Sequence, residues 1–304
     1  MRTTCLINNY NYAQYVSEAI ESALNQSVSF DEIIVVDDAS TDDSRTVLQQ
    51  GFSNHPAVKL LLKAKNGGQL SCFNEGFLMA AGDLIFFLDA DDTYKPNYLE
   101  EALKIYQTNS QCDFLFCSHE KIGSKREIFH TYREDRALGR STLLTLYAYE
   151  WIGDVTSTLS MTRDTLSQIL PFNELETWRV RADSCLVFGA SIVGSRKFYL
   201  AQPLVNYRIH SKNNYHDRQK TSSVKRNLSH YDFCMARAQF FTLLEKKMNY
   251  DRDRLSRLAH LEFISKKNPY REELLSYIRL VLGLKISFFF KVKMILVMLK
   301  HFFI

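Results

Sequence analysis

Three carboxylates follow an apolar segment and lie within four positions of one another. Residues 84–88 are uninterruptedly apolar, and the chain then reads Asp89, Ala90, Asp91, Asp92. Carboxylates this close repel one another and raise one another's pKa unless a cation neutralises them. Such hard oxygen ligands suit Mg²⁺ or Mn²⁺ bound to a phosphate-bearing substrate. The segment therefore predicts a metal–diphosphate site, and the motif alone leaves a solvated acidic turn open as the alternative.

Strand and helix patterns alternate along the first hundred residues. Apolar runs predict strands at residues 3–7, 32–37, 58–62 and 84–88. Apolar residues at helical spacing predict helices at residues 12–25, 42–52 and 69–81. Continuous apolar strands joined by helices indicate an α/β fold with a mixed, mainly parallel sheet flanked by helices. The carboxyl ends of parallel strands share one edge of a sheet, and ligands bind at that edge.

Beyond Pro96 the pattern is mixed. It predicts a helix to about residue 108, strands at 113–118 and 156–161, an irregular stretch at 121–140, a helix at 180–193 and an extended run at 198–210. A polar segment at 211–223 has no periodicity and predicts a domain boundary. We expect a catalytic domain at residues 1–215 and a basic helical C-terminal region at 216–304, with helices at 224–248, 251–266 and after Pro269.

Motifs at the ends of the four predicted strands occur in the order of a known family. They are Asn8-Asn9-Tyr10-Asn11, Val35-Val36-Asp37-Asp38-Ala39-Ser40-Thr41-Asp42, Asn66-Gly67-Gly68 with Asn74-Glu75-Gly76, and Leu88-Asp89-Ala90-Asp91-Asp92. Over roughly residues 1–212 the chain resembles the family 2 glycosyltransferases, which have the GT-A fold. Four linked motifs are more specific than any one of them. The resemblance implies a nucleotide-sugar donor laid along the strand ends.

The resemblance also implies roles for individual residues in the donor site. Tyr10 would pack against the base, and Asp38 would accept hydrogen bonds from its ring NH. Asn66 would belong to the same site, Asp89 would reach the ribose, and Asp91 would hold the metal that bridges the two phosphates. Other interpretations stay open for three of them. Tyr10 also fits a partly buried loop aromatic, Asp38 a turn cap, and Asn66 the shaping of a helix start.

The run Tyr207-Arg208-Ile209-His210-Ser211 matches the tail motif of the family, in which a His or Arg closes over the diphosphate. The resemblance implies that His210 is a further metal ligand and that Arg208 is a phosphate clamp or a scaffold charge. Simple packing of a histidine at a strand end is the alternative. Two positions depart from the family pattern: Asn8 replaces a common proline, and Phe73 replaces an Arg of many relatives. The second departure leaves donor identity open.

Inverting transfer needs a base that removes the proton of the acceptor hydroxyl, and a carboxylate is the usual choice. The family places an acidic residue just before or inside an apolar helix, which implies Asp183 as the base. A helix-start aspartate is the alternative, and Glu176 is the second candidate for the base. Trp178 fits either an apolar platform for the acceptor sugar or a core position.

Composition narrows the class of protein. The chain has 304 residues, 46% of them hydrophobic, which indicates a packed globular core. Six cysteines without CxxC spacing argue against structural zinc. The N-terminus has too few apolar residues for a signal peptide, so we expect a cytoplasmic protein. Charge is uneven: residues 1–215 hold 20 Lys and Arg against 26 Asp and Glu, whereas residues 216–304 hold 18 against 8.

The basic half ends in an apolar stretch, residues 280–304, that contains Lys285, Lys291, Lys293 and Lys300. No uncharged run approaches the ~20 residues of a membrane-spanning helix. The pattern predicts an interfacial helix on the anionic inner face of a membrane. The alternative is packing on the catalytic domain or on a second subunit of a homodimer. Purely apolar runs argue against binding of nucleic acid.

Together the patterns predict an inverting, metal-dependent glycosyltransferase of the hexosyl type. It would move a sugar to a hydroxyl of a glycan or lipid-linked glycan at the cytoplasmic membrane face, with Mn²⁺ or Mg²⁺ as cofactor. One alternative is a non-catalytic, membrane-associated scaffold with the GT-A fold. Another reads residues 89–93 as the DxDxT signature of haloacid-dehalogenase-like phosphatases, although that motif normally lies on the first strand.

Overall fold

Four parallel strands form the first half of the sheet, as predicted. The computed structural model describes residues 1–109, 111–173, 178, 181–210 and 223–304. In the order β3-β2-β1-β4, the strands are β1 (Thr3–Asn9), β2 (Glu32–Asp37), β3 (Val58–Leu62) and β4 (Leu84–Asp89). Asn9 lies opposite Asp37, and Asn8 lies opposite Asp89. The register therefore brings the polar ends of β1, β2 and β4 to one edge.

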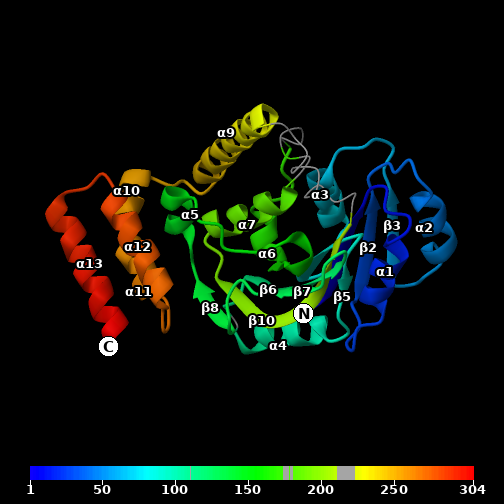
Figure 1. Cartoon of the computed structure of the whole chain (residues 1–304), viewed down its shortest axis with the longest axis horizontal. Helices are drawn as coiled ribbons and strands as arrows, with labels where there is room; N and C mark the ends of the chain where they lie inside the picture. Colours follow the sequence, from blue (N-terminus) through cyan, green and yellow to red (C-terminus); the bar gives the residue numbers. More distant parts are fainter. Residues whose placement is uncertain (110, 174–177, 179–180, 211–222) are drawn as a thin grey trace.

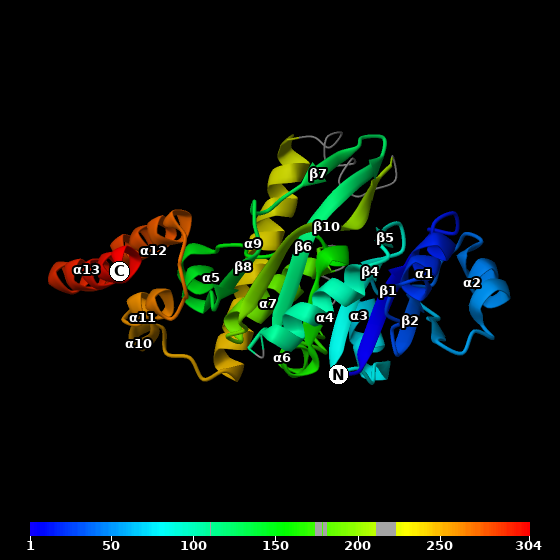
Figure 2. The ribbon, with the colours of Figure 1, turned by 90° about the horizontal axis from the view of Figure 1, so that it is seen from below.

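The second half of the sheet mixes directions. Its strands are β5 (Thr93–Tyr94), β6 (Phe114–Gly123), β7 (Glu127–Phe129), β8 (Arg136–Gly139), β9 (Ser160–Thr162) and β10 (Lys197–Ile209). β9 runs antiparallel between β4 and β6, and β10 is parallel to β6. In Figure 2 the long strands β6 and β10 continue, with β7, beyond the parallel part of the sheet. The sheet is thus mixed, and the predicted α/β class is confirmed.

Two stretches differ from the sequence-based expectation. β6 continues to Gly123, three residues into the stretch predicted to be irregular, because it pairs with both β7 and β10, and β7 and β8 themselves lie within that stretch. The strand predicted at residues 156–161 begins instead with a 3₁₀ turn, η1 (Thr156–Thr158), and β9 follows it. The hydroxyl of Thr158 donates to the carbonyl of Val155 inside this turn. Such local side-chain bonds compete with strand pairing.

Helices cover both faces of the sheet. One core cluster joins the sheet to helices α1 (Val16–Leu24), α2 (Ser44–Phe52) and α4 (Tyr98–Thr108). The other joins it to helices α3 (Gln69–Met79), α5 (Thr142–Ala148), α6 (Arg163–Ser167) and α7 (Ala182–Ile192). Two helical layers around a buried sheet explain why the strands are apolar on both sides. The same arrangement leaves the carboxyl ends of the strands as the place for a site.

The C-terminal region is helical, as predicted. It contains α9 (Ser223–Lys247), α10 (Arg252–Ser256), α11 (Ala259–Ile264), α12 (Arg271–Gly283) and α13 (Phe288–Phe303). A single helix was expected at residues 251–266, but α10 and α11 are separate there. These helices share a core cluster with the sheet, and α13 lies at the opposite end of the molecule from α2 (Figure 1). The boundary expected at residue 215 lies outside the described residues.

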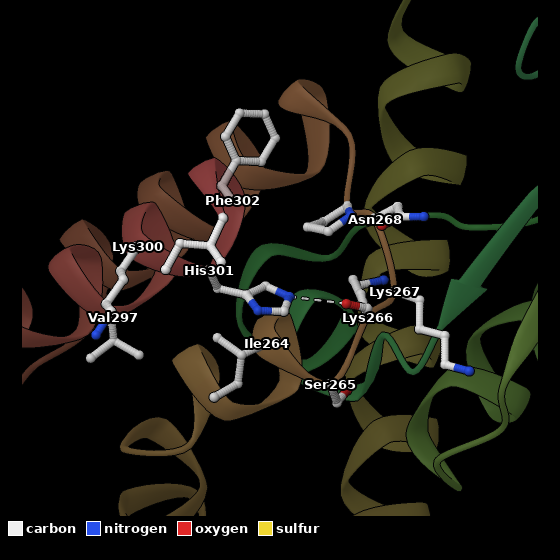
Figure 3. Close-up of a pocket in the computed structure, with 11 residues that line it drawn as sticks. Ile264, Ser265, Lys266, Lys267, Asn268, Val297, Lys300, His301 and Phe302 are labelled. Atoms are coloured by element: carbon white, nitrogen blue, oxygen red, sulfur yellow. Dashed lines mark hydrogen bonds between the residues drawn. The ribbon is translucent and has the colours of Figure 1, made fainter.

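Helix α13 has two different faces. Met294 and Met298 are buried against α11 and α12. On the inward side the ring of His301 points at the backbone carbonyl of Lys266, 3.0 Å away, in a hollow beside the turn between α11 and α12 (Figure 3). The side chain of Phe289, by contrast, is 85% exposed. In the described part of the chain no helix is both long and apolar enough to cross a membrane.

Candidate active site

The loops after β1 and β2 are tied together by buried side chains. The amide of Asn9 donates to Oδ1 of Asp37 (2.7 Å) and to the hydroxyl of Ser40 (3.2 Å). Asp37 also accepts the backbone N–H of Ser40 (3.0 Å), which closes a tight turn around Ala39 in the left-handed region (φ 58°). Tyr10 follows Asn9 and is 45% exposed. The loop thus presents an aromatic ring to solvent beside the strand ends.

Asp38 organises the loop that precedes α3. Its Oδ1 accepts Nζ of Lys63 (2.5 Å) and the backbone N–H of Gly67 (2.9 Å), and its Oδ2 accepts the N–H of Gly68 (2.7 Å). The side-chain amide of Asn66 donates to the carbonyl of Asp38 (3.0 Å). Burial is the largest single influence on the pKa of Lys63 and lowers it, but the bond to Asp38 and the nearby acidic groups together outweigh burial and leave that pKa raised. No local sequence pattern marks Lys63, because its partner lies 25 residues away.

The three carboxylates after β4 gather in one place. One oxygen from each of Asp89, Asp91 and Asp92 lies within 4.8 Å of the others. Loss of hydration, and then the charge of Asp91, raises the pKa of Asp89 to about 7. Burial and the two neighbouring charges also hold the pKa of Asp92 well above its ordinary value. The cluster therefore has the concentrated negative charge that a divalent cation would neutralise.

The tail of β10 meets this cluster. Nε2 of His210 lies 3.0 Å from Oδ2 of Asp91, and its ring packs against Tyr12 and Tyr15 with centroid distances of 5.6 and 5.0 Å. Two side chains that offer metal-ligand atoms therefore already face each other. Burial, followed by the charges of Asp91 and Asp89, raises the pKa of Tyr12.

Arg208 connects the acidic segment to helix α1. Its Nε donates to the backbone carbonyl of Asp91 (2.8 Å), and its Nη2 donates to Glu18 of α1 (2.6 Å). The guanidinium also lies over the ring of Tyr15, 4.8 Å from the centroid. Of the two roles expected for Arg208, these contacts correspond to the scaffold charge.

Asp183 lies near the acidic cluster, at the start of helix α7. It lies in the first turn of α7, and its Oδ1 accepts the backbone N–H of Ser184 (2.8 Å). Its charge contributes to the raised pKa values of Asp89 and Tyr207, so it lies near the acidic cluster. Glu176, the second candidate for the base, lies outside the described residues.

Two aromatic residues singled out in the sequence belong to the core. Trp178 is 1% exposed and contacts Phe233 and Phe240 of α9, with ring centroids 5.7 and 5.5 Å away. It is therefore a core residue and offers no platform to an acceptor sugar. Phe73 is fully buried and packs edge-on against Phe87. The position where many relatives carry Arg is thus a core position in this chain.

Polar side chains outside the predicted set hold the acidic segment. The amide of Gln69 donates to Oδ1 of Asp89 (2.8 Å), and the hydroxyl of Ser157 donates to Oδ2 of Asp92 (2.6 Å). Neither residue belongs to a motif that predicted a function. The available signal for Ser157 was the run of three consecutive hydroxyl residues, Thr156, Ser157 and Thr158.

Sequence comparisons agree with this geometry. The family model described as glycosyl transferase family 2 matches residues 4–170. An uncharacterised glycosyltransferase of Nostoc sp. is 34% identical over 218 residues, which cover 71% of this chain and 67% of that protein. The chondroitin synthase of Escherichia coli is 33% identical over 113 residues, which cover 37% of this chain and 16% of that enzyme.

The solved structures show the same fold. Residues 1–349 of S. aureus TarS, in complex with UDP-GlcNAc, superpose with a TM-score of 0.60 at 18% sequence identity. The match covers 100% of this chain and 73% of that one, and it confirms the predicted GT-A fold. The family model spans more than half of the chain, and the match to the Nostoc protein spans two thirds of that relative. The chain therefore belongs to glycosyltransferase family 2.

Proposed function

We propose that this glycosyltransferase moves a hexose-type unit from a nucleoside-diphosphate sugar to a hydroxyl of a glycan or lipid-linked glycan, with inversion. The observation that carries the proposal is the acidic cluster: Asp91 and His210 face each other, and Asp183 lies near them on α7. The UDP-GlcNAc complex of TarS supports a uridine donor. The chondroitin synthase similarity supports a role in polysaccharide synthesis at the cell envelope.

The strand ends offer a linear donor site. Tyr10 would stack on the base, and Asp38 would accept its ring NH at an acceptor position left beside Lys63 and the two glycine amides. Asn66 would support this loop, and Asp89 would reach the ribose. These roles follow the order of the motifs along the sheet edge.

The donor set of the acidic cluster fits a divalent cation, because it consists of closely spaced carboxylate oxygens with one imidazole nitrogen. Asp91 and His210 would hold Mn²⁺ or Mg²⁺. The bound ion would neutralise the charge that develops on the leaving diphosphate. Arg208 keeps the backbone of Asp91 in place, so the ligand atoms are presented without rearrangement.

Asp183 is the proposed general base. Its carboxylate would take the proton of the acceptor hydroxyl as that oxygen attacks the sugar opposite to the leaving diphosphate. The hydrogen bond from Ser184 orients the carboxylate at the start of α7.

The protein is also proposed to lie on the inner face of the membrane through α13. Phe288, Phe289, Leu296 and Phe303 are all exposed and fall within an arc of about 100° on a helical wheel. The exposed Lys293 and Lys300 both lie just beyond one edge of this arc. An apolar strip bordered on one side by cations complements an anionic lipid surface. The charge excess of residues 216–304 points to the same partner.

Asp91→Asn is expected to lower transfer at least 100-fold at every Mn²⁺ concentration, because the amide keeps the shape but removes the ligand charge. The measurement is nucleoside diphosphate release with a donor panel and an acceptor extract. Asp164→Asn, an exposed carboxylate of α6, is the matched control and should retain full rate. Recovery of the Asp91→Asn rate by added Mn²⁺ would contradict the assigned role.

Asp183→Asn is expected to lower the rate of transfer by about 10²- to 10⁴-fold, while the donor dissociation constant stays within a few-fold of that of the wild type. A base acts on the acceptor and contributes little to donor binding. The check combines donor titration by calorimetry with single-turnover kinetics. Turnover near the wild-type rate would remove Asp183 from this role and direct the same pair of measurements to Glu176.

The double change Phe288→Asp and Phe289→Asp is expected to weaken binding to vesicles of phosphatidylglycerol and phosphatidylcholine by at least tenfold, since two apolar anchors become anions. Wild type should bind pure phosphatidylcholine less tightly and should dissociate in high salt. Leu78→Asp, at an exposed position of α3, is the control. Equal sedimentation of both variants with vesicles, or self-association through this strip, would exclude the membrane contact.

A further inference from the structure

One buried hydroxyl contacts both ends of the acidic segment. Oγ of Ser157 accepts the backbone N–H of Asp89 (3.1 Å) and donates its hydrogen to Oδ2 of Asp92 (2.6 Å). A serine hydroxyl has one hydrogen and two lone pairs, so both bonds form at once. Ser157 is fully buried. Removal of this hydroxyl therefore takes one hydrogen-bond partner from the N–H of Asp89 and one from the buried carboxylate of Asp92.

Asp92 joins this hydroxyl to β10. Its second oxygen, Oδ1, accepts the backbone N–H of Arg208 (2.8 Å). Both oxygens of a carboxylate that is 1% exposed thus receive protein donors. Asp91, in contrast, directs Oδ2 at His210. Asp92 therefore links the acidic segment to the turn η1 and to β10 through two hydrogen bonds.

A second side chain connects the same turn to Asp89. Nε2 of Gln69 donates to Oδ1 of Asp89 (2.8 Å) and lies 3.3 Å from the hydroxyl of Thr156. Gln69 is the first residue of α3 and directly follows Gly68, whose N–H binds Asp38. Asp89 is consequently held from the η1 side and from the α3 side.

The turn η1 is fixed independently of the acidic segment. The carbonyl of Leu159 accepts the N–H of Phe87 in β4 (3.1 Å), and the hydroxyl of Tyr98 in α4 donates to the carbonyl of Thr158 (3.2 Å). Inside the turn, the hydroxyl of Thr158 bonds to the carbonyl of Val155. The side chain of Ser157 is therefore a fixed point for the carboxylates beside it.

We infer that Ser157 is a positioning residue for the metal–diphosphate site. It sets the separation of Asp89 and Asp92 against their mutual repulsion, and thereby places Asp91 between them. The inference rests on the proposed function and extends it to a residue outside the four motifs. Loss of partners that hold metal ligands typically costs about 10- to 100-fold in metal affinity or activity.

The test measures thermal stabilisation of the full chain by Mn²⁺ in the presence of UDP, and separately of GDP. Ser157→Ala should raise the Mn²⁺ concentration for half-maximal stabilisation by about 10- to 100-fold. Ser160→Ala is the matched control, because it removes a buried hydroxyl of the adjoining strand β9 that bonds to Tyr106 and touches no carboxylate. It should lower the melting temperature and leave the Mn²⁺ concentration near that of the wild type.

If the alanine variant does not fold, the same measurement is made on Ser157→Cys. The thiol is close in size to the hydroxyl but is a weaker hydrogen-bond donor. A rise in the Mn²⁺ requirement of the cysteine variant supports the inference. Equal Mn²⁺ requirements for the Ser157 and Ser160 variants, with a wild type that is stabilised, overturn the positioning role and leave the proposed function intact. A wild type that Mn²⁺ does not stabilise with either nucleotide overturns both.

Discussion

Mutual repulsion of three carboxylates is the constraint around which the rest of the site is arranged. Asp89, Asp91 and Asp92 bring oxygen atoms within 4.8 Å of one another, where like charges destabilise the ionised forms. Hydrogen-bond donors from the surrounding chain contact this segment. They are the hydroxyl of Ser157, the amide of Gln69, the backbone N–H of Arg208 and the guanidinium of Arg208, which bonds to the backbone carbonyl of Asp91. Much of the polar bonding at this edge of the sheet therefore holds the three carboxylates in place.

The sheet explains why this concentration is possible. Parallel pairing of β1 with both β2 and β4 places Asn8 opposite Asp89 and Asn9 opposite Asp37, so polar groups far apart in sequence share one edge. The antiparallel strand β9 then brings η1 against the end of β4, and the long strand β10 returns His210 to the same edge. Each element adds donors or ligands from one further direction.

The local parts of this arrangement were predictable from the sequence, and the long-range parts were not. Continuous apolar runs predicted β1 to β4, and four motifs at their ends predicted the family, because both signals lie within short windows. The ion pair of Asp38 with Lys63 and the bonds of Ser157 join residues 25 and 65 positions apart. Local patterning predicted a strand at residues 156–161, whereas residues 156–158 form a 3₁₀ turn that the side chain of Thr158 closes on Val155. The burial of Trp178 likewise depends on α9, which lies far along the chain.

Binding of a nucleoside-diphosphate sugar through a divalent cation is the central claim, and thermal stability tests it most directly. The purified protein would be heated with a panel of nucleotide sugars in Mn²⁺, in Mg²⁺ and in EDTA, because a ligand of the folded state raises the melting temperature by mass action. We predict that one nucleotide sugar gives a shift that disappears in EDTA. Absence of a shift with every nucleotide sugar in both metals, or a shift that EDTA leaves unchanged, would contradict the account.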